Sequence, residues 1–111
     1  MDRVETYRSI VKQVLENRRA EAGEEAGVRV EVVADDAGGH YQLVRVGWRE
    51  TRRIFQVIIH VDFVAEKVVV EKEGTDFTLV DDLIKGGISP SEIVLGFHPP
   101  AHRKYTEFAV T

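Results

Sequence analysis

Residues 40–74 read HYQLVRVGWRETRRIFQVIIHVDFVAEKVVVEKEG, a stretch with the composition of three β-strands separated by short polar turns. β-branched and aromatic residues dominate it, which favours a pleated and packed sheet. Residues 49–51 and 64–66 fit short connections, so the neighbouring strands should pair antiparallel. We expect this sheet to be the core against which the rest of the chain packs.

The middle strand of this stretch carries an alternating pattern from Arg53 onward. Because successive side chains on a strand point to opposite faces, every second residue should share one wall. The apolar set expected on one face is Phe55, Val57, Ile59, Val61 and Phe63. The set expected on the other, mixed face is Ile54, Gln56, Ile58, His60 and Asp62.

The segments before the meander predict a helix and a strand. Apolar residues at three-and-four spacing indicate an amphipathic helix over residues 2–22, with Asp2 as its cap and glycine at its end. Residues 28–35 alternate between apolar and polar side chains, as in a half-buried strand.

A second helix should follow Gly74, with Thr75 or Asp76 as its cap. Beyond it, Pro99 and Pro100 prevent regular strand pairing and anchor the tail. The sequence therefore predicts an α+β fold: an N-terminal helix, an antiparallel meander of about four to five strands, a second helix and a Pro-anchored C-terminal tail.

The bulk properties of the chain fit a single globular domain over residues 1–111. The composition, 43% hydrophobic and 31% charged, is that of a folded protein. Zero cysteines exclude disulfides, thiol catalysis and Cys-ligated zinc. The net charge of −4 argues against non-specific nucleic-acid binding as the main activity, because phosphate contacts need clustered cations. With a charged start and no apolar run of about 18 residues, we expect a cytoplasmic protein without a signal peptide or membrane span.

One candidate site for chemistry lies on the mixed face of the middle strand. His60 and Asp62, with Glu71 on the next strand, could hold a divalent metal as nuclease-like sites do. The spacing is not specific, and a polar sheet face or interface is the better interpretation. The chain also has no Walker loop, GxGxxG or GxSxG motif. We therefore expect no catalytic residue, no cofactor and no metal.

A second candidate site is the tail, GFHPP at residues 96–100 followed by HRKYTEF at residues 102–108. Its prolines, histidines, cations and aromatic residues could form a rigid recognition surface. They could equally fold back to seal the sheet, with Phe97, Tyr105 and Phe108 as plugs. Trp48, near a turn, is expected in the core or at an interface. The candidate partner-binding residues are Trp48, His60, Asp62, Phe97, His98, Pro99, Pro100, Arg103 and Tyr105.

Arginines gather near the first turn of the meander. Arg45, Arg49, Arg52 and Arg53 form a small basic group, which is most often solvated and occasionally contacts phosphate or an acidic partner. Direct DNA binding through these arginines is therefore one open hypothesis.

The chain carries, in order, the segments YRSIVKQVL, HYQLVRVGW, RRIFQVIIHVDF, EGTDF, LVDDLIKGGISPSEIVLGFHPP and RKYTEFAV. Over nearly its whole length it resembles the XisI family, the fdxN element excision controlling factor proteins. It departs from the family pattern at Ala65-Glu66 and Val69, where the family often has a glycine turn and a tryptophan. These departures concern a turn and a strand surface, so they affect the partner surface and leave the fold unchanged.

The resemblance implies a small cytoplasmic accessory factor, typically cyanobacterial, associated with site-specific DNA excision in heterocyst differentiation. The recombination chemistry belongs to a separate recombinase, and XisI is paired with XisH, a nuclease-like protein. XisI itself has no known catalytic motif.

We therefore expect a non-enzymatic regulator that binds an XisH-like partner and, through it, the recombination machinery. A homodimer formed through the sheet or the tail is a secondary hypothesis. The rival hypothesis is a metal-dependent nuclease or nuclease subunit that uses His60, Asp62 and Glu71.

Overall fold

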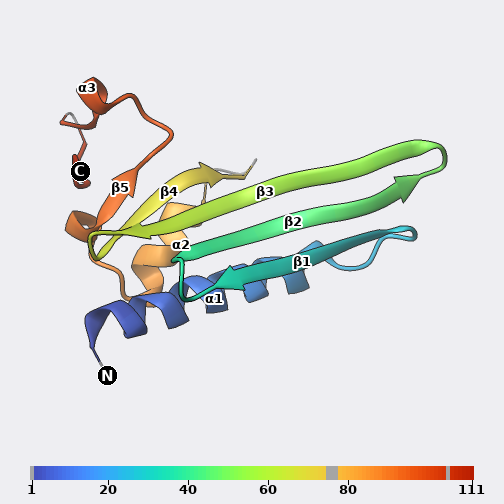
Figure 1. Cartoon of the computed structure of the whole chain (residues 1–111), viewed down its shortest axis with the longest axis horizontal. Coiled ribbons are helices and arrows are strands. Elements are labelled where there is room, and N and C mark those ends of the chain that lie inside the picture. The colour runs from blue at the N-terminus through green and yellow to red at the C-terminus, as the bar shows by residue number, and fades with distance from the viewer. Residues whose placement is uncertain (1, 75–77, 105) are drawn as a thin grey trace.

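The computed structural model describes residues 2–74, 78–104 and 106–111, and it confirms the predicted α+β fold (Figure 1). A five-stranded sheet has the order β1-β2-β3-β4-β5, with antiparallel pairing from β1 to β4 and parallel pairing of β4 with β5. The elements are α1 (Arg3–Ala22), β1 (Val28–Asp35), β2 (His40–Arg49), β3 (Arg52–Val64), β4 (Lys67–Glu73), α2 (Leu79–Gly86), a 3-10 turn (Pro90–Glu92), β5 (Ile93–Leu95) and α3 (Pro100–Arg103). No described helix combines the length and apolar character needed to cross a membrane.

Helix α1 begins and ends where the sequence predicts. The Asp2 carboxylate accepts the backbone N–H of Glu5 at 2.8 Å, which satisfies one donor of the first turn. Gly23 follows the last turn with φ 68°, a conformation that costs glycine little. The buried residues of α1 recur at helical spacing and face the sheet: Tyr7, Val11, Val14 and Leu15.

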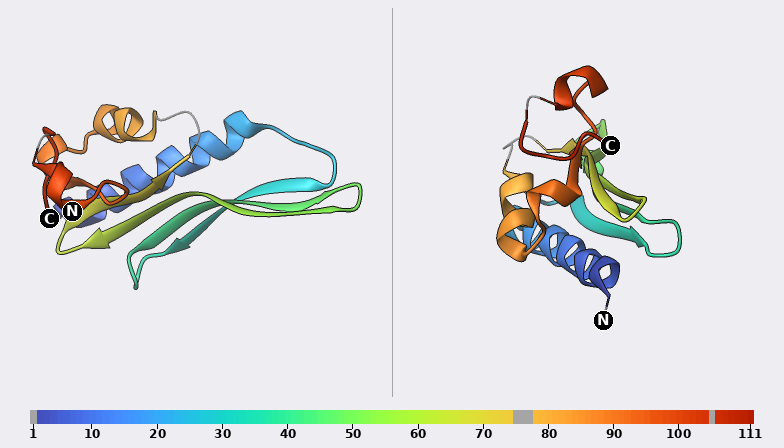
Figure 2. Two further views of the ribbon diagram at one scale, coloured as in Figure 1. Left: turned by 90° about the horizontal axis from the view of Figure 1, so that it is seen from above. Right: turned by 90° about the vertical axis from the view of Figure 1, so that its left-hand side faces the viewer.

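The helices α1 and α2 lie on one face of the sheet, and the main core lies between the two layers (Figure 2). The core takes alternate residues of the meander together with the apolar sides of both helices. Its sheet residues are Tyr41, Leu43, Ile59, Val61, Val68 and Val70. No described helix covers the other face of the β2–β3 hairpin, and this hairpin reaches beyond the end of α1 (Figures 1 and 2).

A β-bulge in β3 overturns the expected division of its side chains. Leu43 pairs with Ile59 but the next residue, Val44, pairs with Val57, so Ile58 is an extra residue in β3. Side-chain alternation is therefore reset at this point, and the predicted wall from Phe55 to Phe63 is wrong in its first half. Phe55 is 73% exposed on the face opposite the helices, whereas Ile54, expected on the mixed face, is only 8% exposed.

The pairing of β5 also differs from the wholly antiparallel sheet expected. The chain leaves β4, passes through α2 and returns in the same direction, which is the crossover that parallel strands require. Thr75 and Asp76, predicted as caps of the second helix, lie outside the described residues. Gly87, with φ 120°, caps the C-terminal end of α2.

An ion pair joins the two helices above the sheet. The Arg18 guanidinium donates to the Asp82 carboxylate at 2.7 Å and 3.1 Å and to the Thr78 hydroxyl at 2.7 Å. The Arg18 side chain is only 10% exposed, so its charge depends on these acceptors. The contact therefore holds α2 against α1.

We expect Arg18→Ala to lower the free energy of unfolding by about 1–3 kcal/mol, because it leaves a partly buried carboxylate without its charged donor. Urea denaturation followed by circular dichroism measures this change. The matched control is Arg19→Ala, which removes an exposed pair with Glu16 and should cost less than about 0.5 kcal/mol. Equal losses for the two variants would contradict the role given to Arg18.

Candidate functional site on the open face of the sheet

The face of the β2–β3 hairpin opposite α1 and α2, here called the open face, carries the candidate site. Directly opposed residues of two antiparallel strands point to the same face. The pairs that share the open face are His40–Asp62, Gln42–His60, Val44–Val57, Val46–Phe55 and Trp48–Arg53. Polar groups therefore gather at one end of the hairpin and aromatic groups at the other.

The polar end is a hydrogen-bonded group that we call the His–Asp cluster: His40, His60 and Asp62. The Asp62 Oδ1 atom accepts from His40 Nδ1 at 2.6 Å and from His60 Nε2 at 2.6 Å. The side chains of Asp62 and His60 are 15% and 23% exposed, and that of His40 is 57% exposed. Two imidazoles from neighbouring strands therefore converge on one half-buried carboxylate oxygen.

Gln42 completes this network through the other ring nitrogen of His60. Its side-chain nitrogen lies 2.8 Å from His60 Nδ1, and an amide nitrogen can only donate. In the neutral form of His60, Nδ1 accepts this hydrogen bond, and Nε2 donates its proton to the Asp62 carboxylate, which can only accept.

The contacts within the cluster shift two pKa values in opposite directions. The hydrogen bond from His40 to Asp62, reinforced by the carboxylate charge, raises the pKa of His40 above its usual value. Burial alone would raise the pKa of Asp62, but the hydrogen bonds and charges of His40 and His60 outweigh it and lower this pKa. The cluster thus favours an imidazolium–carboxylate pair.

The structure does not bring Glu71 into this cluster. A second bulge makes Glu71 an extra residue in β4, since Val70 pairs with Val61 and Lys72 with His60. The Glu71 carboxylate instead lies against Gly96, where an added Cβ would collide with its Oε1 atom. The third member of the cluster is His40 and not Glu71. The sequence did not indicate His40, because its position opposite Asp62 depends on the register of β2 and β3.

The aromatic end of the open face is an exposed group that we call the aromatic patch: Trp48, Arg53 and Phe55. Trp48 is 51% exposed and Phe55 is 73% exposed. The Arg53 guanidinium carbon lies 5.2 Å from the Trp48 ring centre and 5.8 Å from that of Phe55, within cation–π range of both. Trp48 is therefore exposed and not part of the core, and Phe55 joins it on the open face because of the bulge.

The four arginines near the hairpin turn do not form one patch. Arg53 is on the open face, whereas strand alternation places Arg45, Arg49 and Arg52 on the face of the helices. Arg49 donates twice to the Glu25 carboxylate, at 2.7 Å and 3.0 Å, and this hydrogen-bonded pairing lowers the pKa of Glu25. The basic group expected from the sequence is thus divided between faces and partly neutralised.

The C-terminal tail folds back along the edge of the sheet. The Ala109 backbone N–H donates to the Ile93 carbonyl at 2.8 Å, and Phe108 packs against the core. Arg103 donates to the carbonyls of His98, Gly96 and Val110 at 3.1–3.4 Å, which holds the turn of the tail together.

Of the tail residues expected to seal the sheet, Phe108 packs against the core, whereas Phe97 does not. Phe97 is 41% exposed, with its ring 4.8 Å from that of His98 in an edge-to-face contact. Pro99 precedes α3 and Pro100 begins it, while Tyr105 lies outside the described residues. The tail and the β2–β3 turn lie at opposite ends of the molecule (Figure 1), so the predicted site residues do not form one surface.

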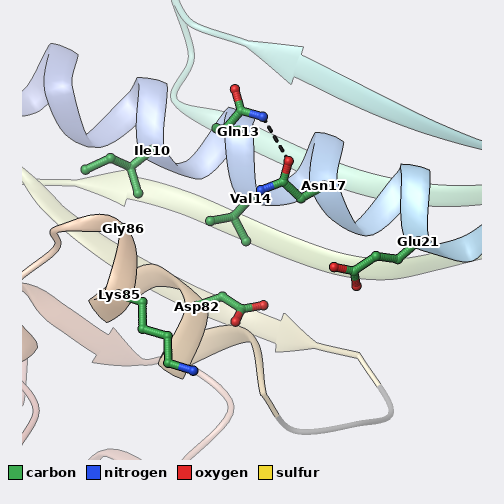
Figure 3. Close-up of a pocket in the computed structure, with 8 residues that line it drawn as sticks. All are labelled: Ile10, Gln13, Val14, Asn17, Glu21, Asp82, Lys85 and Gly86. Carbon is green, nitrogen blue, oxygen red and sulfur yellow. Dashed lines mark hydrogen bonds between the residues drawn. The ribbon is translucent and has the colours of Figure 1, made fainter.

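A groove of about 360 Å³ lies between α1 and α2 (Figure 3). Ile10 and Val14 give it an apolar side, and a hydrogen bond of 2.9 Å joins Gln13 and Asn17 above them. Its other lining residues are Glu21, Asp82, Lys85 and Gly86. Among the described residues predicted as site residues, none lines this groove, so we place the candidate site on the open face.

Comparison with known proteins gives one family. The family model described as XisI protein matches residues 1–110. A crystal structure of a XisI-like protein from Anabaena variabilis ATCC 29413 is 30% identical, has a TM-score of 0.92 and covers 98% of this chain and 100% of its own. The crystal structure of the fdxN element excision controlling factor XisI from the same organism is 25% identical, has a TM-score of 0.86 and covers 99% and 100%. Among curated proteins, none matches.

We expect the His40 imidazole, followed by NMR in a buffer containing EDTA, to titrate above the usual value of about 6.5, and Asp62→Asn to lower its midpoint. The raised pKa of His40 adds stability that is full below about pH 6.5 and is lost as the pH rises through the folded-state value. The lowered pKa of Asp62 adds stability that is present above about pH 4 and is lost as the pH falls through its folded-state value. The melting-temperature difference between wild type and Asp62→Asn should therefore be largest between these limits. A His40 midpoint that Asp62→Asn leaves unchanged would contradict the pairing.

Proposed function

Because the chain belongs to the XisI protein family, we propose that it is a non-enzymatic accessory factor in the control of DNA-element excision and acts by binding an XisH-like protein. One similar crystal structure is of a protein named the fdxN element excision controlling factor, which is a regulatory description. Through its partner, the chain would reach the recombination machinery. The observation that carries the proposed binding role is the exposed aromatic patch.

The composition of the aromatic patch is that of a binding surface. Tryptophan and arginine are enriched among the residues that dominate protein–protein affinity, and aromatic residues as a class are enriched at interfaces. Phe55 exposes 73% of its surface to water, so covering its ring on binding would be favourable. Arg53 already lies between two rings, which reduces the side-chain entropy lost when a partner covers it.

The position of the patch also favours a macromolecular partner. The hairpin that carries it projects past α1, and no described helix shields its open face (Figure 2). An exposed surface of paired strands suits another protein surface better than a small ligand, which binds in concave sites. The groove between α1 and α2 lies on the other side of the sheet and does not compete with this surface.

The two alternative functions receive less support. The nuclease hypothesis used Glu71 as the third ligand, and this carboxylate lies against Gly96 instead. The DNA-binding hypothesis needs a basic surface, but its four arginines lie on two faces and Arg49 is paired with Glu25.

We expect Trp48→Ala and Phe55→Ser to weaken binding of a purified XisH-like protein at least about tenfold, because truncating a central hot-spot residue costs about 2 kcal/mol or more and tenfold corresponds to about 1.4 kcal/mol. Isothermal titration calorimetry measures the affinity. Phe97→Ser is the matched control, since it removes an exposed aromatic ring at the other end of the molecule. Binding lost in Phe97→Ser but kept in Phe55→Ser would place the interface on the tail and contradict this proposal.

Sedimentation of the chain alone over a range of concentrations separates partner binding from self-association. A species of 12.5 kDa at all concentrations, with the complex forming only when the XisH-like protein is added, is the expected result. A dimer that Phe55→Ser dissociates would instead assign the patch to a second copy of this chain.

A further inference from the structure

The polar end of the open face has the geometry of a metal site. His40, His60 and Asp62 each offer one ligand atom, and these atoms all lie within 4.8 Å of one another. Ligand atoms that share a zinc ion tetrahedrally at about 2.0–2.2 Å lie about 3.3–3.6 Å apart. This spacing falls between the 2.6 Å hydrogen-bond contacts and the 4.8 Å limit of the group, so small rotations of the side chains would fit them around an ion. We propose that the His–Asp cluster binds one divalent transition-metal ion, of which Zn²⁺ is the test case.

The strands fix the ligands before any ion arrives. His40 and Asp62 lie directly opposite each other on β2 and β3, and Gln42 and His60 form the next open-face pair. Both imidazole nitrogens already lie 2.6 Å from the Asp62 oxygen, so the three ligand atoms are gathered in one place, and an ion would enter between them in exchange for the shared protons. A preformed site of this kind avoids most of the ordering cost that flexible side chains incur.

Gln42 supplies the outer contact that histidine ligands usually have. A metal on His60 Nε2 leaves the proton on Nδ1, which then needs an acceptor. The Gln42 amide lies 2.8 Å from Nδ1, and a half-turn of this amide presents its oxygen in place of its nitrogen. The same contact therefore serves the metal-free and the metal-bound forms.

The ligand set and the surroundings select the class of ion. Imidazole nitrogens suit zinc, copper, iron and nickel, whereas Mg²⁺ and Ca²⁺ prefer sites built of oxygen atoms. Asp62 is partly buried and His40 is largely exposed, so one side of the ion would remain open to water or to a partner group. Two charged residues of opposite sign flank the cluster: Asp35 on β1 lies opposite His40, and Lys72 on β4 lies opposite His60.

The test titrates the chain, prepared without a polyhistidine tag, with Zn²⁺ by calorimetry and with Co²⁺ by absorption spectroscopy. We expect one ion per chain, a rise in melting temperature with Zn²⁺ and none with Mg²⁺. His40→Ala, His60→Ala and Asp62→Ala should each weaken binding at least tenfold. His98→Ala and His102→Ala, which alter histidines of the tail, should leave it unchanged.

Three results would overturn the proposal: no binding at micromolar Zn²⁺, undiminished binding in His60→Ala, or binding lost in His98→Ala instead. Circular dichroism without metal shows whether each variant folds. If His60→Ala does not fold, NMR of the wild type decides. The ring resonances of His40 and His60 must then shift with one equivalent of Zn²⁺ while those of His98 and His102 stay in place, and the opposite pattern refutes the site.

Discussion

The single extra residue at Ile58 determines which side chains of β3 lie on the open face. Strand alternation ties each side chain to one face, and a bulge is the local device that resets it. Beyond the bulge, Ile59 and Val61 fill the core beneath the helices; before it, Phe55 and Val57 turn to the open face. A regular strand would have placed Phe55 on the face of the helices and Ile54 on the open face. The aromatic patch exists because β3 is irregular.

The elements that depend on local chemistry were predictable from the sequence. Asp2 and Gly23 delimit α1, and the alternation in residues 28–35 matches β1 from end to end. The hairpin turn at Ala65-Glu66 was also expected, although both residues adopt positive φ angles, 51° and 65°, that glycine or asparagine usually supplies. Caps, turns and periodicity act over a few residues, which is why a sequence displays them.

The features that depend on pairing between distant residues were not predictable. Bulges arise from the fit of two strands, so neither Ile58 nor Glu71 carries a local sign of its role. His40 belongs to the candidate site only through a register that opposes it to Asp62, 22 residues further along the chain. Three-residue β5 is parallel because the intervening α2 returns the chain in that direction. The His60–Asp62 half of the cluster was visible because its members are close in sequence.

The return of the tail along β5 has a consequence for how the sheet meets other chains. An unpaired edge strand offers its backbone amides and carbonyls to any extended segment that approaches it. The Ala109 N–H donates to the carbonyl of Ile93, so the C-terminal residues cover part of the β5 edge. The opposite border, β1, carries the charged neighbours Arg29 and Glu31, which bond to each other at 2.8 Å and discourage sheet-to-sheet growth. The two borders of the sheet are thus protected against pairing with further strands, whereas no described helix covers the open face.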